Sequence, residues 1–78
     1  MVSEKLRSVI RAQLRLDASF PIEEETSAPR VPGWDSLAHV ALLAAVEHAF
    51  GVRFRTLEVL KLRNVGDLQA LVDRKLGG

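Results

Sequence analysis

Few side chains in this sequence could do chemistry, and they gather around one serine. Ser36 follows a Gly-Trp-Asp triplet and precedes an apolar run that extends to Phe50. A serine acts as a nucleophile only with a base within hydrogen-bond reach and a further group that orients the base. His39 lies three residues later, about 60° around a helix, but we expect it to point toward the core, and no carboxylate is evidently placed to hold it. These residues argue against catalysis by the chain itself.

Composition removes most other chemistries. The chain has no cysteine, which excludes disulfides, thiolate metal ligands and a cysteine nucleophile. Its two histidines, His39 and His48, leave a zinc site built from protein ligands alone short of nitrogen donors. The sequence has no glycine-rich phosphate-binding loop. We therefore predict that the chain is not an enzyme and holds no metal.

Ser36 could instead accept a covalently attached group. A serine hydroxyl at the start of a helix is accessible, and the N-terminal amides and the helix dipole stabilise a phosphate there. A protein without cysteine that carries a thioester would need its thiol from a prosthetic arm joined at such a serine. Asp and Ser are also the ordinary capping residues of helices, so the motif has a purely structural interpretation as well.

The first element that must position this serine is a helix predicted over residues 4–15. Ser3 is suited to cap it, and Glu4 near its start and Arg15 near its end follow the charge order that the helix dipole favours. Its apolar residues have the spacing of one buried stripe: Leu6, Val9, Ile10 and Leu14.

A long loop over residues 17–34 leads to the next helix. All three prolines of the chain lie in it, and proline prevents a long helix or strand. A connection of this length in a small domain tends to be functional. We expect four apolar side chains to anchor the loop across the helices: Phe20, Ile22, Val31 and Trp34.

The second helix is predicted from Ser36 to about Phe50, because Gly51 can adopt the left-handed conformation that ends many helices. Its core face holds Leu42, Leu43, Val46 and Phe50, with His39 among them. The sector headed by Ser36 lies outside the core and is largely apolar, which often marks a docking site; it contains Leu37, Val40, Ala44, Glu47 and His48. The back of the helix is alanine: Ala38, Ala41, Ala45 and Ala49.

Two further helices complete the expected fold. A short helix runs from Leu57 to about Leu62 with Thr56 as its cap, and Asn64 caps a last helix, with Asp67 placed as in a capping box. The last helix has a buried stripe of Val65, Leu68, Leu71, Val72 and Leu76. The predicted fold is therefore all-α, with three main helices and one short third helix in a single domain over residues 1–78.

Charge and hydropathy limit the partners of this domain. The net charge of +1 divides into +3 over residues 1–15, −5 over residues 16–51 and +3 over residues 52–78. A DNA-reading helix needs basic or amide side chains, but the second helix has no Lys or Arg, and the last has only Arg74 and Lys75 near its end. No apolar run reaches the ~20 residues that span a bilayer, and the N-terminus lacks a secretory segment. We expect a cytoplasmic protein with no nucleic-acid partner and no membrane insertion.

With these elements in place, the sequence resembles the acyl carrier protein family. The family motif is a glycine, any residue and then Asp-Ser-Leu at the start of the second of four helices, and this chain has Gly33-Trp34-Asp35-Ser36-Leu37 there. The end of that helix, Glu-His-Ala-Phe-Gly-Val, also matches the family pattern. The resemblance covers essentially the whole chain and implies a free-standing, four-helix acyl-carrier-like bundle.

The resemblance implies that Ser36 receives phosphopantetheine through a phosphodiester, installed by a phosphopantetheinyl transferase that contacts Asp35 and Leu37. The thiol of the arm would then carry an acyl, aminoacyl or polyketide group as a thioester. The implied partners are the transferase, a loading enzyme and a downstream synthase or transferase, and we expect the carrier to act as a monomer.

Two further sets of residues follow from the resemblance. Partner enzymes would contact the surface formed by Trp34, Leu37, Val40, Ala44, Glu47 and His48. A cleft that shelters an acyl chain would be lined by Leu42, Val46, Phe54, Val59, Leu62 and Leu68, which we expect to form ordinary core in the resting state.

The departures from the family pattern suggest a specialised carrier. Carriers of fatty-acid synthesis repeat Asp and Glu along the second helix, and basic patches on their enzymes recognise these acids. Here Ala38 and Ala41 stand where acids are typical, and Glu47 is the only acid of the helix. Pro32 replaces a leucine, and Trp34 precedes Asp-Ser as in some carriers of nonribosomal and polyketide pathways. Our hypothesis is a carrier of a dedicated pathway, with an apolar interface, rather than the housekeeping one.

Two alternatives stay open. The chain could be an unmodified carrier-like helical module that acts only by docking. His39 could be a histidine satisfied at the helix edge, or it could contact the arm or its cargo.

Overall fold

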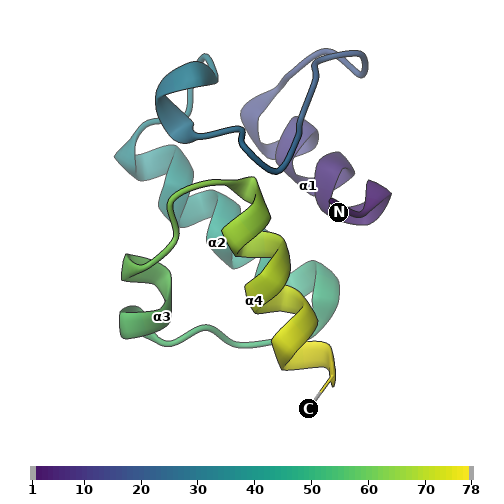
Figure 1. The fold of residues 1–78 in the computed structure, drawn as a ribbon. Coiled ribbons are helices and arrows are strands. Elements are labelled where there is room, and N and C mark those ends of the chain that lie inside the picture. Colours follow the sequence, from purple (N-terminus) through teal and green to yellow (C-terminus); the bar gives the residue numbers. More distant parts are fainter. Residues whose placement is uncertain (1, 78) are drawn as a thin grey trace.

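A computed structural model describes residues 2–77, and in that range it is all-α (Figure 1). Three long helices are α1 (Glu4–Leu14), α2 (Ser36–Phe50) and α4 (Val65–Gly77). The short ones are the 3₁₀ helix η1 (Ala28–Arg30) in the long loop and α3 (Thr56–Leu60). The predicted fold class is confirmed, including the short third helix. None of these helices is both long and apolar enough to cross a membrane.

Helix α1 begins and ends as the sequence predicts. The Ser3 hydroxyl accepts a hydrogen bond from the Leu6 N–H at 3.2 Å, which caps the helix. Arg15 adopts the left-handed conformation with φ 54°, so the helix ends at Leu14, one residue earlier than expected. Its buried side chains are Leu6, Ile10 and Leu14, and Val9 packs against them at the edge of the core.

The long loop is held by two arginines of α1 as well as by its apolar anchors. Arg7 Nε donates to the Ile22 carbonyl at 2.9 Å, and Arg11 donates to the Phe20 carbonyl from Nε at 3.1 Å and from Nη2 at 2.8 Å. Of the four predicted anchors, Ile22 and Val31 are buried, whereas Phe20 and Trp34 are half-buried against the core. The anchors are confirmed, and the arginine contacts are additional.

The same loop covers the start of α4. The Val65 N–H donates to the Thr26 carbonyl at 2.8 Å, and the Gly66 N–H donates to the Glu24 carbonyl at 2.9 Å. A side chain at Gly66 would place its Cβ 3.1 Å from the Glu24 carbonyl oxygen. The glycine therefore permits the close approach that satisfies two of the free N-terminal amides of α4.

Helix α2 packs against the core formed with α1 and α4, and its bounds match the prediction. Gly51 has φ 67° and donates its N–H to the Glu47 carbonyl, which ends the helix. Leu42, Leu43 and Val46 are buried, as predicted, and α1 packs directly against α2. The alanine side is not a solvent-exposed back, because Ala38, Ala45 and Ala49 are half-buried and only Ala41 is exposed.

The predictions for α3 and α4 need three corrections. Thr56 does not cap α3, because it is the first helical residue and Arg55 occupies the cap position, where its N–H donates to the Glu58 carboxylate at 2.8 Å. Helix α3 ends at Leu60, two residues early, because the chain turns at Lys61. Leu76 is exposed, because the last turn of α4 extends beyond the core that ends with Val72.

The cap of α4 is confirmed, with a small change. The Asn64 side chain accepts from the Asp67 N–H at 2.8 Å. The Asp67 carboxylate accepts from the N–H of Arg63 at 3.0 Å, one residue earlier than a capping box requires, and also from Arg63 Nε at 3.0 Å.

One buried polar side chain, Gln69, was not predicted. Gln69 is buried in α4, where its Oε1 accepts from the Ser3 N–H at 2.8 Å and its Nε2 donates to Asp73 Oδ1 at 2.8 Å. Because these contacts satisfy the buried amide, it fixes the start of α1 beside α4 without the cost of an unpaired polar group.

Candidate carrier site

Ser36 is the first residue of α2, and its side chain is exposed. The capping contact belongs to its neighbour: Asp35 Oδ1 accepts from the Ala38 N–H at 2.8 Å, and the Asp35 carbonyl accepts from the His39 N–H at 2.8 Å. Among residues 2–77, no hydrogen bond engages the Ser36 hydroxyl. The structural role of the motif is therefore carried by Asp35, which leaves the serine hydroxyl available for another use.

The chain reaches Ser36 through a tight turn. Gly33 has φ 81°, a left-handed conformation in which a side chain would be strained, and the Trp34 N–H donates to the Val31 carbonyl at 3.3 Å. Since Val31 is buried, the turn links the exposed serine to the core over a few residues.

Trp34 and His39 form a pair beside the serine. The indole Nε1–H of Trp34 donates to His39 Nδ1 at 3.0 Å, and the two rings lie 6.0 Å apart at an interplanar angle of 30°. Nδ1 can accept this bond only while it carries no proton. This nitrogen is thus occupied by Trp34 and does not serve Ser36 as a base. The geometry favours the satisfied histidine over the contact to the arm.

The apolar sector of α2 is exposed, as the sequence predicts. Leu37 is 83% exposed and Val40 is 67% exposed, and Ala44 and His48 are exposed as well. Glu47 differs, because it is half-buried and its Oε2 accepts from the Phe54 N–H at 2.7 Å. The only acid of α2 therefore stabilises the connector to α3. Trp34, expected in the same surface, is half-buried and turned toward His39.

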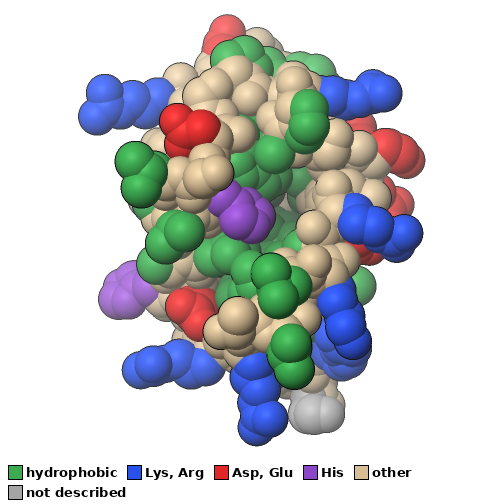
Figure 2. Space-filling model, turned by 90° about the vertical axis from the view of Figure 1, so that its left-hand side faces the viewer, with side chains coloured by type: hydrophobic (Ala, Val, Ile, Leu, Met, Phe, Trp, Pro, Cys, Tyr) green, Lys and Arg blue, Asp and Glu red, His purple; other side chains and the backbone are tan. Residues whose placement is uncertain are grey.

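An apolar groove of about 290 Å³ lies between α2 and α3. We call it the α2–α3 groove; it is lined by Val40, Leu43, Ala44, Glu47, Phe54, Thr56, Val59 and Leu60. Figure 2 shows hydrophobic side chains across the centre of this face of the molecule, around a central histidine.

The six residues predicted for an acyl cleft do not line one common cavity. Phe54 and Val59 line the α2–α3 groove, whereas Leu62 and Leu68 line a small cavity of about 60 Å³ beside Trp34 and His39. The other two, Leu42 and Val46, are fully buried in the core.

Glu58 of α3 and Asp67 of α4 are paired with bases. Lys75 Nζ lies 2.9 Å from the Glu58 carboxylate, and this hydrogen bond, together with that from the Arg55 backbone, lowers the pKa of Glu58. The hydrogen bond from the Arg63 side chain lowers the pKa of Asp67 in the same way. Both carboxylates therefore stay ionised, and the basic side chain beside each one balances its charge.

Comparison with known proteins identifies the family. No family model matches the chain. It is 33% identical over 76 residues to an acyl carrier protein of Thermotoga maritima, covering 97% of this chain and 93% of that protein. It is 38% identical over 68 residues to an acyl carrier protein of Clostridium acetobutylicum, covering 87% of each. The chain belongs to the acyl carrier protein family.

A solved structure supports the same assignment. The solution structure of a holo acyl carrier protein from Geobacter metallireducens is 37% identical, with a TM-score of 0.84, and the match covers 96% of this chain and 88% of that one. Acyl carrier proteins are carriers rather than enzymes, carry covalent phosphopantetheine, and interact with phosphopantetheinyl transferases and acyl-handling enzymes. The site fits such a group, because an exposed hydroxyl lies in the first turn of a helix whose dipole favours a phosphate.

Two roles are suggested for Asp35 in this acyl carrier protein, the cap of α2 and a contact with the transferase. Substitution can separate them. Asp35→Ala removes the cap of α2 and should lower the free energy of unfolding by about 1 kcal/mol, whereas Asp35→Asn retains a capping oxygen. If a transferase contacts the carboxylate, both variants are modified more slowly than wild type, while only the alanine variant is destabilised. Urea unfolding and a time course of intact mass measure the two effects. Modification of Asp35→Asn at the wild-type rate would exclude the contact to the charge.

His39 can be tested through the only tryptophan of the chain. His39→Ala removes the acceptor of the Trp34 indole, so we expect a changed Trp34 emission and a loss of about 1 kcal/mol of stability. The rates of modification and loading should not change, because the structure gives His39 a partner within the protein. A slower loading step at wild-type stability would instead assign it a contact with the arm or cargo.

Proposed function

We propose that Ser36 is the residue to which phosphopantetheine is attached, and that the protein carries acyl, aminoacyl or polyketide thioesters on this arm. The observation that supports the proposal is that the cap of α2 is formed by the neighbour of Ser36 and not by Ser36 itself. Asp35 caps the helix, so the exposed Ser36 hydroxyl is free to form a phosphodiester. The first-turn amides and the helix dipole stabilise the phosphate once it is attached.

The neighbouring residues support the interactions that a carrier needs. Leu37 follows the serine and is largely exposed, so a phosphopantetheinyl transferase bound at Ser36 would contact Asp35 and Leu37 together. The exposed residues Val40, Ala44 and His48 extend this surface along α2 toward a loading enzyme and a downstream synthase or transferase. We expect the carrier to act as a monomer, so that one surface serves each partner in turn.

The partners of this carrier belong, in our proposal, to a dedicated pathway rather than to housekeeping fatty-acid synthesis. The support is the character of α2, whose exposed positions are largely apolar and carry no acid, and whose only acid, Glu47, is half-buried and engaged with the Phe54 amide. An enzyme that recognises acidic side chains along α2 would therefore meet no carboxylate that is available for an ion pair. If a housekeeping ketoacyl synthase used this carrier as readily as it uses its own carrier, the proposal of a dedicated pathway would be wrong.

Attachment is tested by intact mass after coexpression with a broad-specificity phosphopantetheinyl transferase. A gain of one phosphopantetheine group supports the proposal. If a control carrier is modified under the same conditions and this protein is not, the protein is instead an unmodified helical module that acts by docking.

A further inference from the structure

Exposed leucines extend the apolar surface of α2 onto α3. Leu57 and Leu60 are each 73% exposed, although α3 has only five residues. Leu60 lines the α2–α3 groove together with Val40 of α2, and Leu37 lies one turn before Val40. An apolar surface that extends over two helices and a groove is more than scattered exposed side chains, and such patches mark interaction sites.

Two exposed arginines in the connector after α2 border this apolar surface on the side away from Ser36. Arg55 is exposed and lies between Phe54 and Thr56, two residues that line the groove. Arg53 is exposed in a hollow that shares Ala44 and Glu47 with the groove. We call Arg53 and Arg55 the basic rim.

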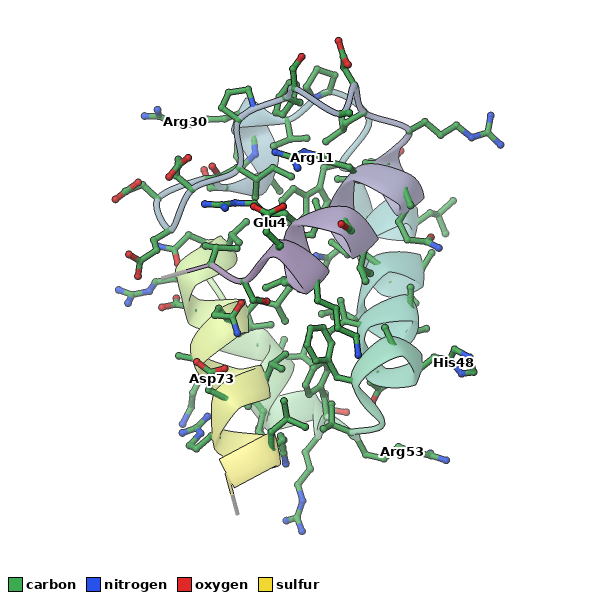
Figure 3. The ribbon with its side chains drawn as sticks, turned by 90° about the vertical axis from the view of Figure 1, so that its right-hand side faces the viewer. Glu4, Arg11, Arg30, His48, Arg53 and Asp73 are labelled. Atoms are coloured by element: carbon green, nitrogen blue, oxygen red, sulfur yellow. The ribbon has the colours of Figure 1, made fainter. Side chains whose placement is uncertain are left out.

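Nearby acids form no ion pair with the basic rim, although the charge of Arg55 contributes to the lowered pKa of Glu58. Glu47 is turned to the Phe54 amide, Glu58 is paired with Lys75, and Asp67 is paired with Arg63. Within residues 2–77, no ion pair involves a side chain of the basic rim. In Figure 2, Lys and Arg side chains surround the lower edge of the apolar face, and Figure 3 shows Arg53 and His48 projecting outward at the end of the molecule opposite Arg30.

We infer that the partner enzymes of this carrier present an acidic rim around an apolar docking site, the opposite of enzymes that bind acidic carriers. The inference rests on the proposed function, since an enzyme that receives the Ser36 arm must approach this end of α2. The 15 residues of α2 span about 20 Å, and Arg53 follows the end of this helix, so the basic rim lies about 20 Å from Ser36. The acidic patch of the partner should thus lie about 20 Å from the entrance through which the arm is inserted.

Charges at the edge of an interface act mainly on the association rate and on the choice of partner. The carrier is first shown by mass to be modified, so that a failure of attachment is separated from a failure of this inference. It is then assayed with two probes: a housekeeping ketoacyl synthase whose docking patch is basic, and the same synthase with the patch Lys and Arg replaced by Glu. We expect kcat/KM to be about tenfold higher with the acidic patch at low salt, and the difference to shrink as salt screens the charges.

The decisive variant is the double charge reversal Arg53→Glu/Arg55→Glu. It should reverse the preference, so that the basic patch is favoured. The matched control is Arg15→Glu/Arg30→Glu, which changes net charge equally at two exposed positions away from the rim and should keep the wild-type preference. Circular dichroism confirms that both double variants are folded.

Three results would overturn the inference. One is equal kcat/KM with both probes, and a second is the same shift in both double variants, which would reflect net charge alone. The third comes from sedimentation with vesicles that contain anionic lipid: binding that is lost in Arg53→Glu/Arg55→Glu would show that the basic rim fits a lipid surface rather than an acidic protein.

Discussion

Replacing Ser36 with alanine should leave the protein folded and abolish modification by a phosphopantetheinyl transferase. The expected loss is complete, because the variant has no hydroxyl with which to form the phosphodiester. Stability should change little, since Asp35 rather than Ser36 caps α2. Intact mass after coexpression reports attachment, and urea unfolding reports stability.

The chain offers a matched control for this variant. Thr56 is also an exposed hydroxyl at the first position of a helix, but it is not followed by the same motif. Thr56→Ala should be modified like wild type. Attachment of the arm to Ser36→Ala would show that another hydroxyl is the acceptor.

Replacing Leu42 with alanine should destabilise the protein by about 3 kcal/mol, because a fully buried leucine leaves a cavity as well as losing its transfer free energy. This is a large share of the roughly 4–12 kcal/mol expected for a domain of this size. The midpoint of urea unfolding measures the loss, with an unchanged slope if the denatured state is unaffected.

Leu57→Ala is the control for the same chemical change at the surface. Leu57 is largely exposed on α3, so its truncation should change stability by less than about 0.5 kcal/mol. Similar losses for the two variants would contradict the placement of Leu42 in the core. Because Leu42 was also predicted for an acyl cleft, a small effect at Leu42 would favour a loosely packed cleft instead.

The features predicted best are those determined by a few adjacent residues. Ser3, Asn64 and Gly51 end or cap their helices as expected, because a cap depends on one side chain or one backbone conformation. The exposure of Val40 beside the buried Leu42 also follows from helical periodicity alone. The errors occur at a short helix and at a helix end beyond the core: Thr56 does not cap α3, which ends at Leu60 rather than Leu62, and Leu76 of α4 is exposed.

By itself, the sequence determined the four helices, the long loop between α1 and α2, and the serine at the start of α2, because periodicity, caps and the Asp-Ser-Leu motif are local. The tertiary structure decided which side chains around α2 have a hydrogen-bond partner within the protein. It gave the capping contact to Asp35, paired His39 with Trp34, and turned Glu47 toward Phe54. These contacts depend on side-chain directions and on chain segments brought together by folding, and they leave the Ser36 hydroxyl exposed, as the proposed attachment requires.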